Sequence, residues 1–142
     1  MLVKDIMTKD VITVSEDDSL HFVGKTLKEK RISGIPVVNS FGQVVGIITL
    51  TDVWRIISSI YKWSTIDRTK DIKDLNQMFL EETKKHKVSD YMTKNVFVLS
   101  EYDKIEDIMQ IMFNNNVHTL PVVKDGKLVG VIGRRDLIYN CF

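Results

Sequence analysis

One half of this 142-residue chain repeats the other half. The segment Val3-Lys-Asp-Ile-Met-Thr-Lys-Asp-Val11 returns as Val88-Ser-Asp-Tyr-Met-Thr-Lys-Asn-Val96, 85 positions later. The same offset relates Pro36-Val37-Val38 to Pro121-Val122-Val123 without a gap. A register held over this distance is typical of a duplicated structural unit, so both halves should share one fold.

Each copy opens with the pattern of a strand followed by a helix. Extended apolar stretches lie at residues 11–14 and 96–99, and in the first copy Ser15-x-x-Asp18 follows with the spacing of a helix capping box. Apolar residues with helical spacing come next, at 20–27 and 105–112. We therefore expect a helix directly after the capping motif in both copies.

Two short β-branched runs and a final helix complete each copy. Residues 35–38 and 44–48 flank a glycine-containing turn, and the second copy has the turn Lys124-Asp-Gly-Lys127, so each copy should form a hairpin. The final helices should begin near Asp52 and Asp136. We expect these side chains to face inward from them: Val53, Ile56, Ile57, Ile60, Leu137 and Ile138.

Neither copy is large enough to bury much surface by itself, so the two should pair. We predict a mixed α/β (α+β) fold in which two β-α-β-β-α repeats, residues 1–63 and 88–142, pack sheet to sheet about a pseudo-twofold axis. Residues 64–87 break the repeat. Within them, 71–85 has the pattern of a polar helix with Ile72, Leu75 and Phe79 on one side, and it should form a connector outside the paired sheets.

Charge and composition exclude several classes of partner. The 20 Lys and Arg and 19 Asp and Glu residues are scattered, so no basic stripe is available for nucleic acid. No apolar run approaches the roughly 18 residues of a membrane span, and Lys4 and Asp5 interrupt any apolar leader, so we expect a cytoplasmic protein without a membrane partner. The single cysteine, Cys141, cannot form a disulfide within the chain.

Motifs of common enzyme classes are absent from the sequence. His21, His86 and His118 are far apart and lack H-E-x-x-H or C-x-x-C context. There is no G-x-S-x-G elbow, no phosphate-binding G-x-x-x-x-G-K-[ST] loop, and no G-x-G-x-x-G after a strand. We expect no catalytic residues, no metal site and no required cofactor.

The junction between the last strand and the last helix is the candidate ligand site. It reads Gly46-Ile-Ile-Thr49-Leu-Thr-Asp52 in one copy and Gly130-Val-Ile-Gly133-Arg-Arg-Asp136 in the other. A helix N-terminus attracts phosphate, and a fixed carboxylate can accept hydrogen bonds from both hydroxyls of a ribose, which together are the needs of a nucleotide. In the alternative, structural interpretation Thr49 caps the helix and Asp52 complements its dipole.

The motif order resembles a tandem cystathionine β-synthase (CBS) repeat pair. Met-Thr, V-x-V, Gly34-Ile-Pro-Val-Val38 and Gly46-Ile-Ile-Thr49-x-x-Asp52-Val53 occur in this order, and the pattern repeats over nearly the whole chain. In that family the pairs form flat modules whose inter-repeat clefts bind AMP, ADP, ATP or S-adenosylmethionine and regulate another protein. The resemblance implies a regulatory adenine-nucleotide-binding module.

The resemblance also implies particular site residues. It places the ribose carboxylates at Asp52 and Asp136 and a phosphate-side hydroxyl at Thr49, which Gly133 replaces in the second copy. The adenine pocket falls on the first strand and on the residues leading into the proline strand. The expected nucleotide-binding residues are Thr13, Ile35, Pro36, Thr49, Asp52, Val98, His118, Thr119, Leu120, Pro121, Arg134, Arg135 and Asp136.

Two further expectations concern partners. Apolar helix faces, including Ile56, Ile57, Ile60 and Ile138, should be only partly covered, which favours a homodimer through these helices. The module would then act on an effector protein. The competing hypothesis is a ligand-free interaction or oligomerisation module, in which the two aspartates only stabilise helix starts.

Overall fold

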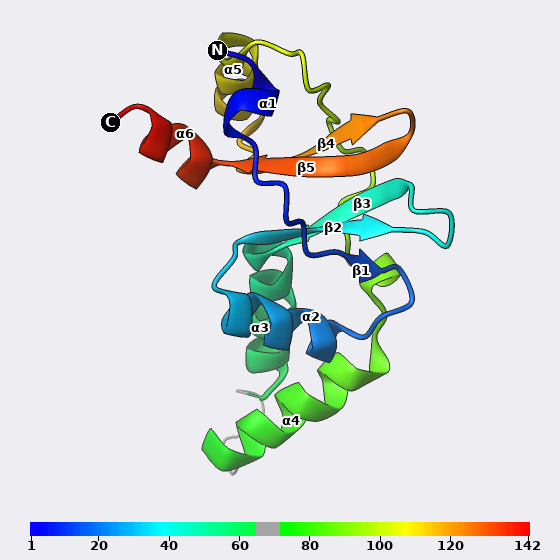
Figure 1. Ribbon diagram of the computed structural model, residues 1–142. Helices are drawn as coiled ribbons and strands as arrows, with labels where there is room; N and C mark the ends of the chain where they lie inside the picture. The colour runs from blue at the N-terminus through cyan, green and yellow to red at the C-terminus, as the bar shows by residue number, and fades with distance from the viewer. Residues whose placement is uncertain (65–71) are drawn as a thin grey trace.

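The computed structural model describes residues 1–64 and 72–142 and shows two α/β units stacked on each other (Figure 1). The elements of the first half are α1 (Val3–Ile6), β1 (Val14–Ser15), α2 (Leu20–Lys30), β2 (Gly34–Val38), β3 (Val44–Thr49) and α3 (Leu50–Ser64). Those of the second are α4 (Ile72–Lys85), the 3-10 helix η1 (Val88–Asp90), α5 (Ile105–Asn115), β4 (Thr119–Lys124), β5 (Lys127–Gly133) and α6 (Arg134–Asn140). None of the described helices is long and apolar enough to cross a membrane.

The two sheets are built around the expected hairpins. β2 pairs antiparallel with β3, and β1 adds to β2 in parallel, with Val14 opposite Val37. β4 pairs antiparallel with β5. At Gly34 an added Cβ would lie 3.2 Å from Oγ1 of Thr119, its equivalent in the other repeat, so the two hairpins meet close to the pseudo-twofold axis.

The first strand of each repeat is shorter than predicted. β1 begins only at Val14, and the expected strand at 96–99 is reduced to a bridge between Leu99 and Val122. The path of the chain before each of these strands explains why the strands are short. Thr8 is hydrogen-bonded to Val131 of the other sheet, so the following residues must first cross between the sheets before they can pair.

The predicted capping motif closes a turn and does not cap the helix. The Ser15 N–H donates to Asp18 Oδ2 at 2.8 Å, which folds the chain back just before α2. The cap itself is Ser19, whose Oγ accepts a hydrogen bond from the Phe22 N–H at 3.1 Å. A helix does follow in both repeats, as predicted, but it begins after this turn.

Each repeat has its own apolar core. In the first, the predicted inner face of α2 meets the sheet and the buried residues Ile56 and Ile60 of α3. In the second, α5 packs on the β4–β5 hairpin through Ile105, Ile108 and Met112. The prediction for Ile138 is wrong: its side chain is 54% exposed, because adjacent positions on a helix diverge by about 100° and it is Leu137 that packs on the core.

The two Met-Thr segments are exchanged between the repeats. Val3 of α1 is buried in the core of the second repeat, and its N–H donates to the Asp103 carbonyl at 2.9 Å. Val88 of η1 is buried in the core of the first, where its N–H donates to the Asp18 carbonyl at 2.8 Å. In Figure 1 the blue N-terminal segment accordingly lies with the unit that contains β4 and β5. Each half of the sequence therefore completes the core of the other.

Methionines at the crossings pack against these cores, as expected for gap-filling side chains. Met7 contacts the second core and Met92 the first. An added Cβ at Gly130 would lie 2.6 Å from Met7 Sδ, and one at Gly46 would lie 2.7 Å from Met92 Sδ. Glycine at these two positions lets the crossing segments approach the strands closely.

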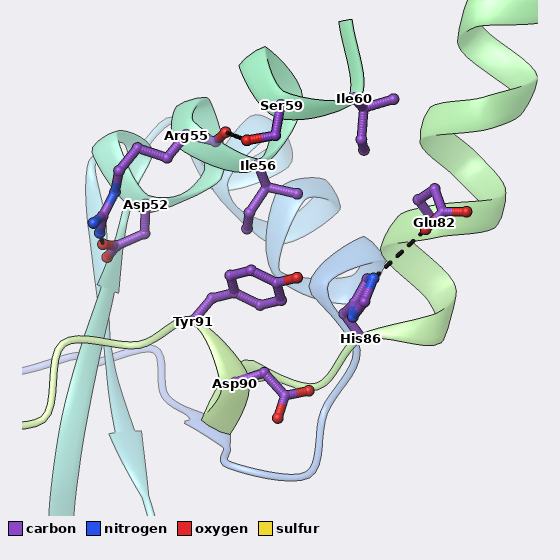
Figure 2. Close-up of a pocket in the computed structure, with 9 residues that line it drawn as sticks. All are labelled: Asp52, Arg55, Ile56, Ser59, Ile60, Glu82, His86, Asp90 and Tyr91. Atoms are coloured by element: carbon purple, nitrogen blue, oxygen red, sulfur yellow. Dashed lines mark hydrogen bonds and ion pairs between the residues drawn. The ribbon is translucent and has the colours of Figure 1, made fainter. Parts of the chain in front are cut away.

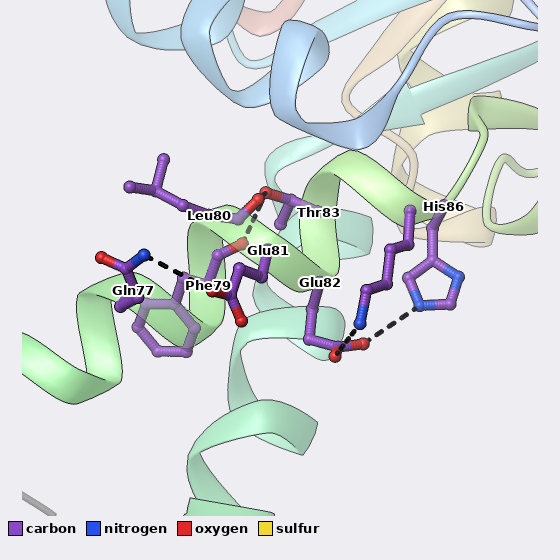
Figure 3. A network of polar contacts seen from close by, with 8 residues as sticks. Gln77, Phe79, Leu80, Glu81, Glu82, Thr83 and His86 are labelled. Atoms are coloured by element: carbon purple, nitrogen blue, oxygen red, sulfur yellow. Dashed lines mark hydrogen bonds and ion pairs between the residues drawn. The ribbon is translucent and has the colours of Figure 1, made fainter.

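Helix α4 lies beside α2 and α3, away from the second repeat (Figure 1). Its Met78 and Phe79 pack against the first core, whereas the side chains of Ile72 and Leu75 lie outside the described residues. Toward its C-terminus Glu82 interacts with Lys85 at 3.4 Å and with His86 at 3.6 Å (Figure 3). The expectation that Ile56 and Ile60 lie on a partly covered helix face is wrong, because they are only 6% and 8% exposed.

Candidate functional site

A cavity of about 270 Å³ lies between the two repeats. The first half supplies the loop before β1 and the residues around the start of β2. The second half supplies the strand-to-helix junction that contains Asp136. The lining residues are Thr8, Asp10, Val11, Ile12, Ile32, Ser33, Gly34, Pro36, Thr119, Val131, Gly133, Arg135 and Asp136.

Asp136 is the central polar group of this inter-repeat cleft. Its Oδ2 accepts a hydrogen bond from the Gly133 N–H at 2.8 Å, which fixes the carboxylate at the start of α6. Its Oδ1 accepts a hydrogen bond at 2.9 Å from the hydroxyl of Thr8, which lies in the exchanged N-terminal segment beside β5. A carboxylate offers roughly four acceptor positions, so about two stay available to a ligand with paired hydroxyls.

The remaining walls of the cleft combine apolar surface with one cation. Ile12, Ile32, Pro36 and Val131 form apolar parts of the lining, and such surfaces suit the faces of an aromatic ring. Arg135 adds a guanidinium, which pairs well with phosphate oxygens. The arrangement can therefore bind a molecule with a flat apolar part, a diol and an anionic end.

The equivalent carboxylate in the first repeat has a different environment. Asp52 is 3% exposed, and its Oδ2 accepts hydrogen bonds from the Thr49 N–H at 2.8 Å and the Thr49 hydroxyl at 3.1 Å. Its Oδ1 is paired with the Arg55 guanidinium. These contacts are the helix-capping arrangement of the structural interpretation, reinforced by an ion pair.

Asp52 lines a second cavity, of about 380 Å³, between α3, the end of α4 and η1 (Figure 2). Ile56, Ile60 and Tyr91 form its apolar parts, and His86 stacks edge-on against Tyr91 with ring centroids 5.3 Å apart. This cavity is lined by α3, the end of α4 and the η1 segment that is exchanged into the first unit. It is therefore distinct from the cleft between the repeats.

The structure separates the other sequence-predicted residues. Pro36, Thr119, Arg135 and Asp136 share the inter-repeat cleft. Arg134 and His118 lie together in an outer groove between α5 and α6, where the Arg134 N–H donates to the His118 carbonyl at 3.2 Å. Five lie elsewhere: Ile35, Leu120 and Pro121 are buried, and Thr13 and Val98 are exposed outside the lining of the cleft.

Thr8 and Asp10 of the cleft were missed by the sequence-based site assignment. Both belong to the repeated Met-Thr segment, and Thr8 is the equivalent of Thr93. Hydroxyl residues repeated at the 85-residue offset were a usable signal. What the sequence did not indicate was the exchange that carries Thr8 to Asp136.

Comparison with known proteins identifies the family. Residues 3–58 and 88–141 match the family model of the CBS domain. The chain belongs to the CBS domain family. Uncharacterized protein MJ1426 of Methanocaldococcus jannaschii is 37% identical over 97% of this chain and 89% of its own length.

Two further similarities bear on the function of this CBS pair. The CBS domain pair of protein MJ0100, solved in complex with 5′-methylthioadenosine and S-adenosyl-L-methionine, is 25% identical with a TM-score of 0.73, over 99% of this chain and 95% of that one. Inosine-5′-monophosphate dehydrogenase of M. jannaschii is 34% identical, but the match takes 94% of this chain and only 22% of the enzyme. The similarity to an enzyme is therefore confined to a small part of it.

Proposed function

We propose that this CBS pair is a regulatory module that binds an adenosine-containing ligand, such as AMP, ADP, ATP or S-adenosylmethionine, in the inter-repeat cleft. The observation that carries the proposal is the placement of Asp136, a fixed carboxylate with spare acceptor positions in a cavity lined by both repeats. The complex of MJ0100 with two adenosyl ligands supports the same ligand class.

The assignment of roles follows the chemistry of the lining. Asp136 accepts hydrogen bonds from the two ribose hydroxyls, since an ionised carboxylate is the strongest acceptor for such a pair. Ile12, Ile32 and Pro36 contact the adenine, and Arg135 faces a phosphate or carboxylate of the ligand. No residue in this assignment acts as a nucleophile or general base, so the module binds and does not catalyse.

The ligand would act by changing how the repeats sit together. Because Pro36 lies in β2 of the first unit and Asp136 lies in α6 of the second, a molecule held by both biases the relative position of the two repeats. A ligand shifts such an equilibrium by its difference in affinity between the two arrangements. The altered surface would then be recognised by a second copy of the chain or by an effector protein.

A thermal-shift panel of AMP, ADP, ATP, S-adenosylmethionine and GTP tests this function. A ligand at about 100 times its Kd stabilises a protein by about 2.7 kcal/mol, which raises the melting temperature by several degrees. Asp136→Ala should reduce the shift to about half or less, and Asp136→Asn should reduce it by a smaller amount. A panel without any shift would reject the proposal.

The second candidate function is a ligand-free interaction module. It is favoured by the outer groove between α5 and α6, where Met109, Phe113 and Ile138 are large exposed apolar side chains. Absence of ligand-induced stabilisation together with concentration-dependent association would support it.

A further inference from the structure

We propose that Arg55 closes the Asp52 counterpart of the ligand site, so that the module binds one adenosyl ligand per chain, at Asp136. The proposal rests on the proposed function and adds which of two equivalent aspartates is used and which residue decides it. The internal duplication provides the comparison, because Asp52 and Asp136 occupy the same place in the two repeats.

The two aspartates differ in what holds their outer carboxylate oxygen. Among the described residues, the side-chain partner of Asp136 Oδ1 is the neutral hydroxyl of Thr8. Oδ1 of Asp52 is instead paired with the guanidinium of Arg55, one turn further along α3 (Figure 2). At the equivalent position of the second repeat stands Tyr139, which is exposed and carries no positive charge.

The partner of the outer oxygen decides whether the paired hydroxyls of a ribose can compete for the carboxylate. A guanidinium-carboxylate hydrogen bond is about twice as strong as one between neutral groups, and this one is intramolecular, so a ribose hydroxyl competes less well for Asp52 than for Asp136. The Thr49 N–H, the Thr49 hydroxyl and Arg55 together occupy three of the roughly four acceptor positions of Asp52. One free position is not enough for two ribose hydroxyls.

The low solvent exposure of Asp52 adds to the effect of its ion pair with Arg55. Asp52 is 3% exposed, whereas the side chain of Arg55 is 67% exposed and lies over it toward the solvent. Asp136 faces the cavity that both repeats line, whereas the cavity beside Asp52 is formed by α3, the end of α4 and η1. Because Arg55 is largely exposed, its replacement should leave the core of the first repeat intact.

Isothermal titration calorimetry with AMP, ADP, ATP and S-adenosylmethionine as separate probes tests the proposal. The wild-type chain should bind one molecule per chain of whichever probe it accepts, and Asp136→Ala should weaken this binding roughly ten- to hundredfold. Arg55→Tyr, which installs the residue of the second repeat, should raise the stoichiometry to two. Lys25→Tyr, at an exposed cation that pairs with Glu29 in α2 outside the cleft, should leave it at one.

A double variant isolates the newly opened site. In the Asp136→Ala background, Arg55→Tyr should restore binding of one molecule, and adding Asp52→Ala should abolish it. Arg55→Ala serves as the second variant if the tyrosine prevents folding, which the melting temperature reports.

The outcomes separate the two proposals. Absence of binding by the wild-type chain rejects the proposed function. Wild-type binding with a stoichiometry of two, or a stoichiometry that stays at one in both folded Arg55 variants, overturns the role of Arg55 while leaving the proposed function standing.

Discussion

At the scale of single residues, Gly46 and Gly130 set how closely the crossing segments approach the sheets. The Ile47 N–H donates to the Thr93 carbonyl at 3.0 Å directly beside Gly46. A side chain at that position would push on the segment that completes the core of the neighbouring repeat. The energetic cost of such a change is therefore shared by both halves of the molecule.

We predict that Gly46→Ala destabilises the protein by about 1–3 kcal/mol, as overpacking does in other tightly packed interiors. The new Cβ would lie 2.8 Å from the Thr93 carbonyl oxygen, which is backbone and cannot rotate away. Urea denaturation measures the change. Gly24→Ala is the control: it lies in α2 with nothing within 4 Å, and it should stabilise by about 0.5–1 kcal/mol. Equal stability of the two variants would contradict this explanation.

Arg134 and Arg135 are neighbours in sequence but line different cavities, and this separates their expected effects. We predict that Arg135→Ala lowers the affinity for ATP more than that for AMP, because its guanidinium lies in the inter-repeat cleft. Arg134→Ala should leave the ratio of the two affinities unchanged, since Arg134 lines the outer groove. Calorimetric titration of both nucleotides measures the ratios, and an equal effect of the two variants would place the phosphates elsewhere.

At the scale of elements, the unduplicated helix α4 acts as a cover for the first repeat. Met78 and Phe79 pack against the core that contains Ile56 and Ile60. The second repeat has no equivalent helix among the described residues, and α6 ends at Asn140 with Ile138 exposed. The repeats therefore differ in apolar surface although their hairpins are alike.

Phe79→Ala tests the covering role of α4. We expect the free energy of unfolding to fall by about 2 kcal/mol, less than for a fully buried phenylalanine because Phe79 is only partly buried. The neighbouring Leu80 is exposed, so Leu80→Ala should change it by less than about 0.5 kcal/mol. Both values come from chemical denaturation, and similar losses in the two variants would mean that α4 has no preferred face.

The sequence pattern correctly predicted elements that depend mainly on their own residues and on a single packing face. The spacing of Leu20, Val23 and Leu27 predicted α2 because an amphipathic face needs only one core to pack on. The strand at 96–99 and the cap at Ser15 were predicted incorrectly, because both depend on where the preceding segment has crossed to. The same limit applies to the site. Asp136 could be proposed from its motif, but its bond to Thr8 depends on a tertiary contact. The pairing of Asp52 with Arg55 depends on a residue that lies outside the motif.

At the scale of the whole molecule, matching grooves run along the outer helices of the two repeats. One is lined by α2 and α3 with Leu50 and Ile57, the other by α5 and α6 with Met109, Phe113 and Ile138. Phe113 is 88% exposed. Apolar side chains gathered in this way on both repeats favour self-association, and the homodimer through these helices remains a prediction.

Phe113→Lys should weaken that dimer by at least about tenfold, because a charge would have to be buried at the interface. The matched control is Phe41→Lys, which replaces a similarly exposed phenylalanine in the β2–β3 turn, away from both grooves. Sedimentation velocity over a range of protein concentrations measures the association. A wild-type chain that stays monomeric at tens of micromolar would rule out the dimer and make another protein the partner of these helices.

The exchange of the Met-Thr segments predicts how the protein responds to a single break in its backbone. Because Val3 is anchored in one core and Val88 in the other, a protease site inserted within residues 65–71 should yield two fragments that remain bound without a covalent link. Either fragment made alone lacks the piece that seals its own interior and should fail to fold, whereas mixing the two should restore a native circular dichroism spectrum. Size-exclusion chromatography of the cleaved protein provides the test, and two separately eluting folded fragments would show that each half is self-sufficient.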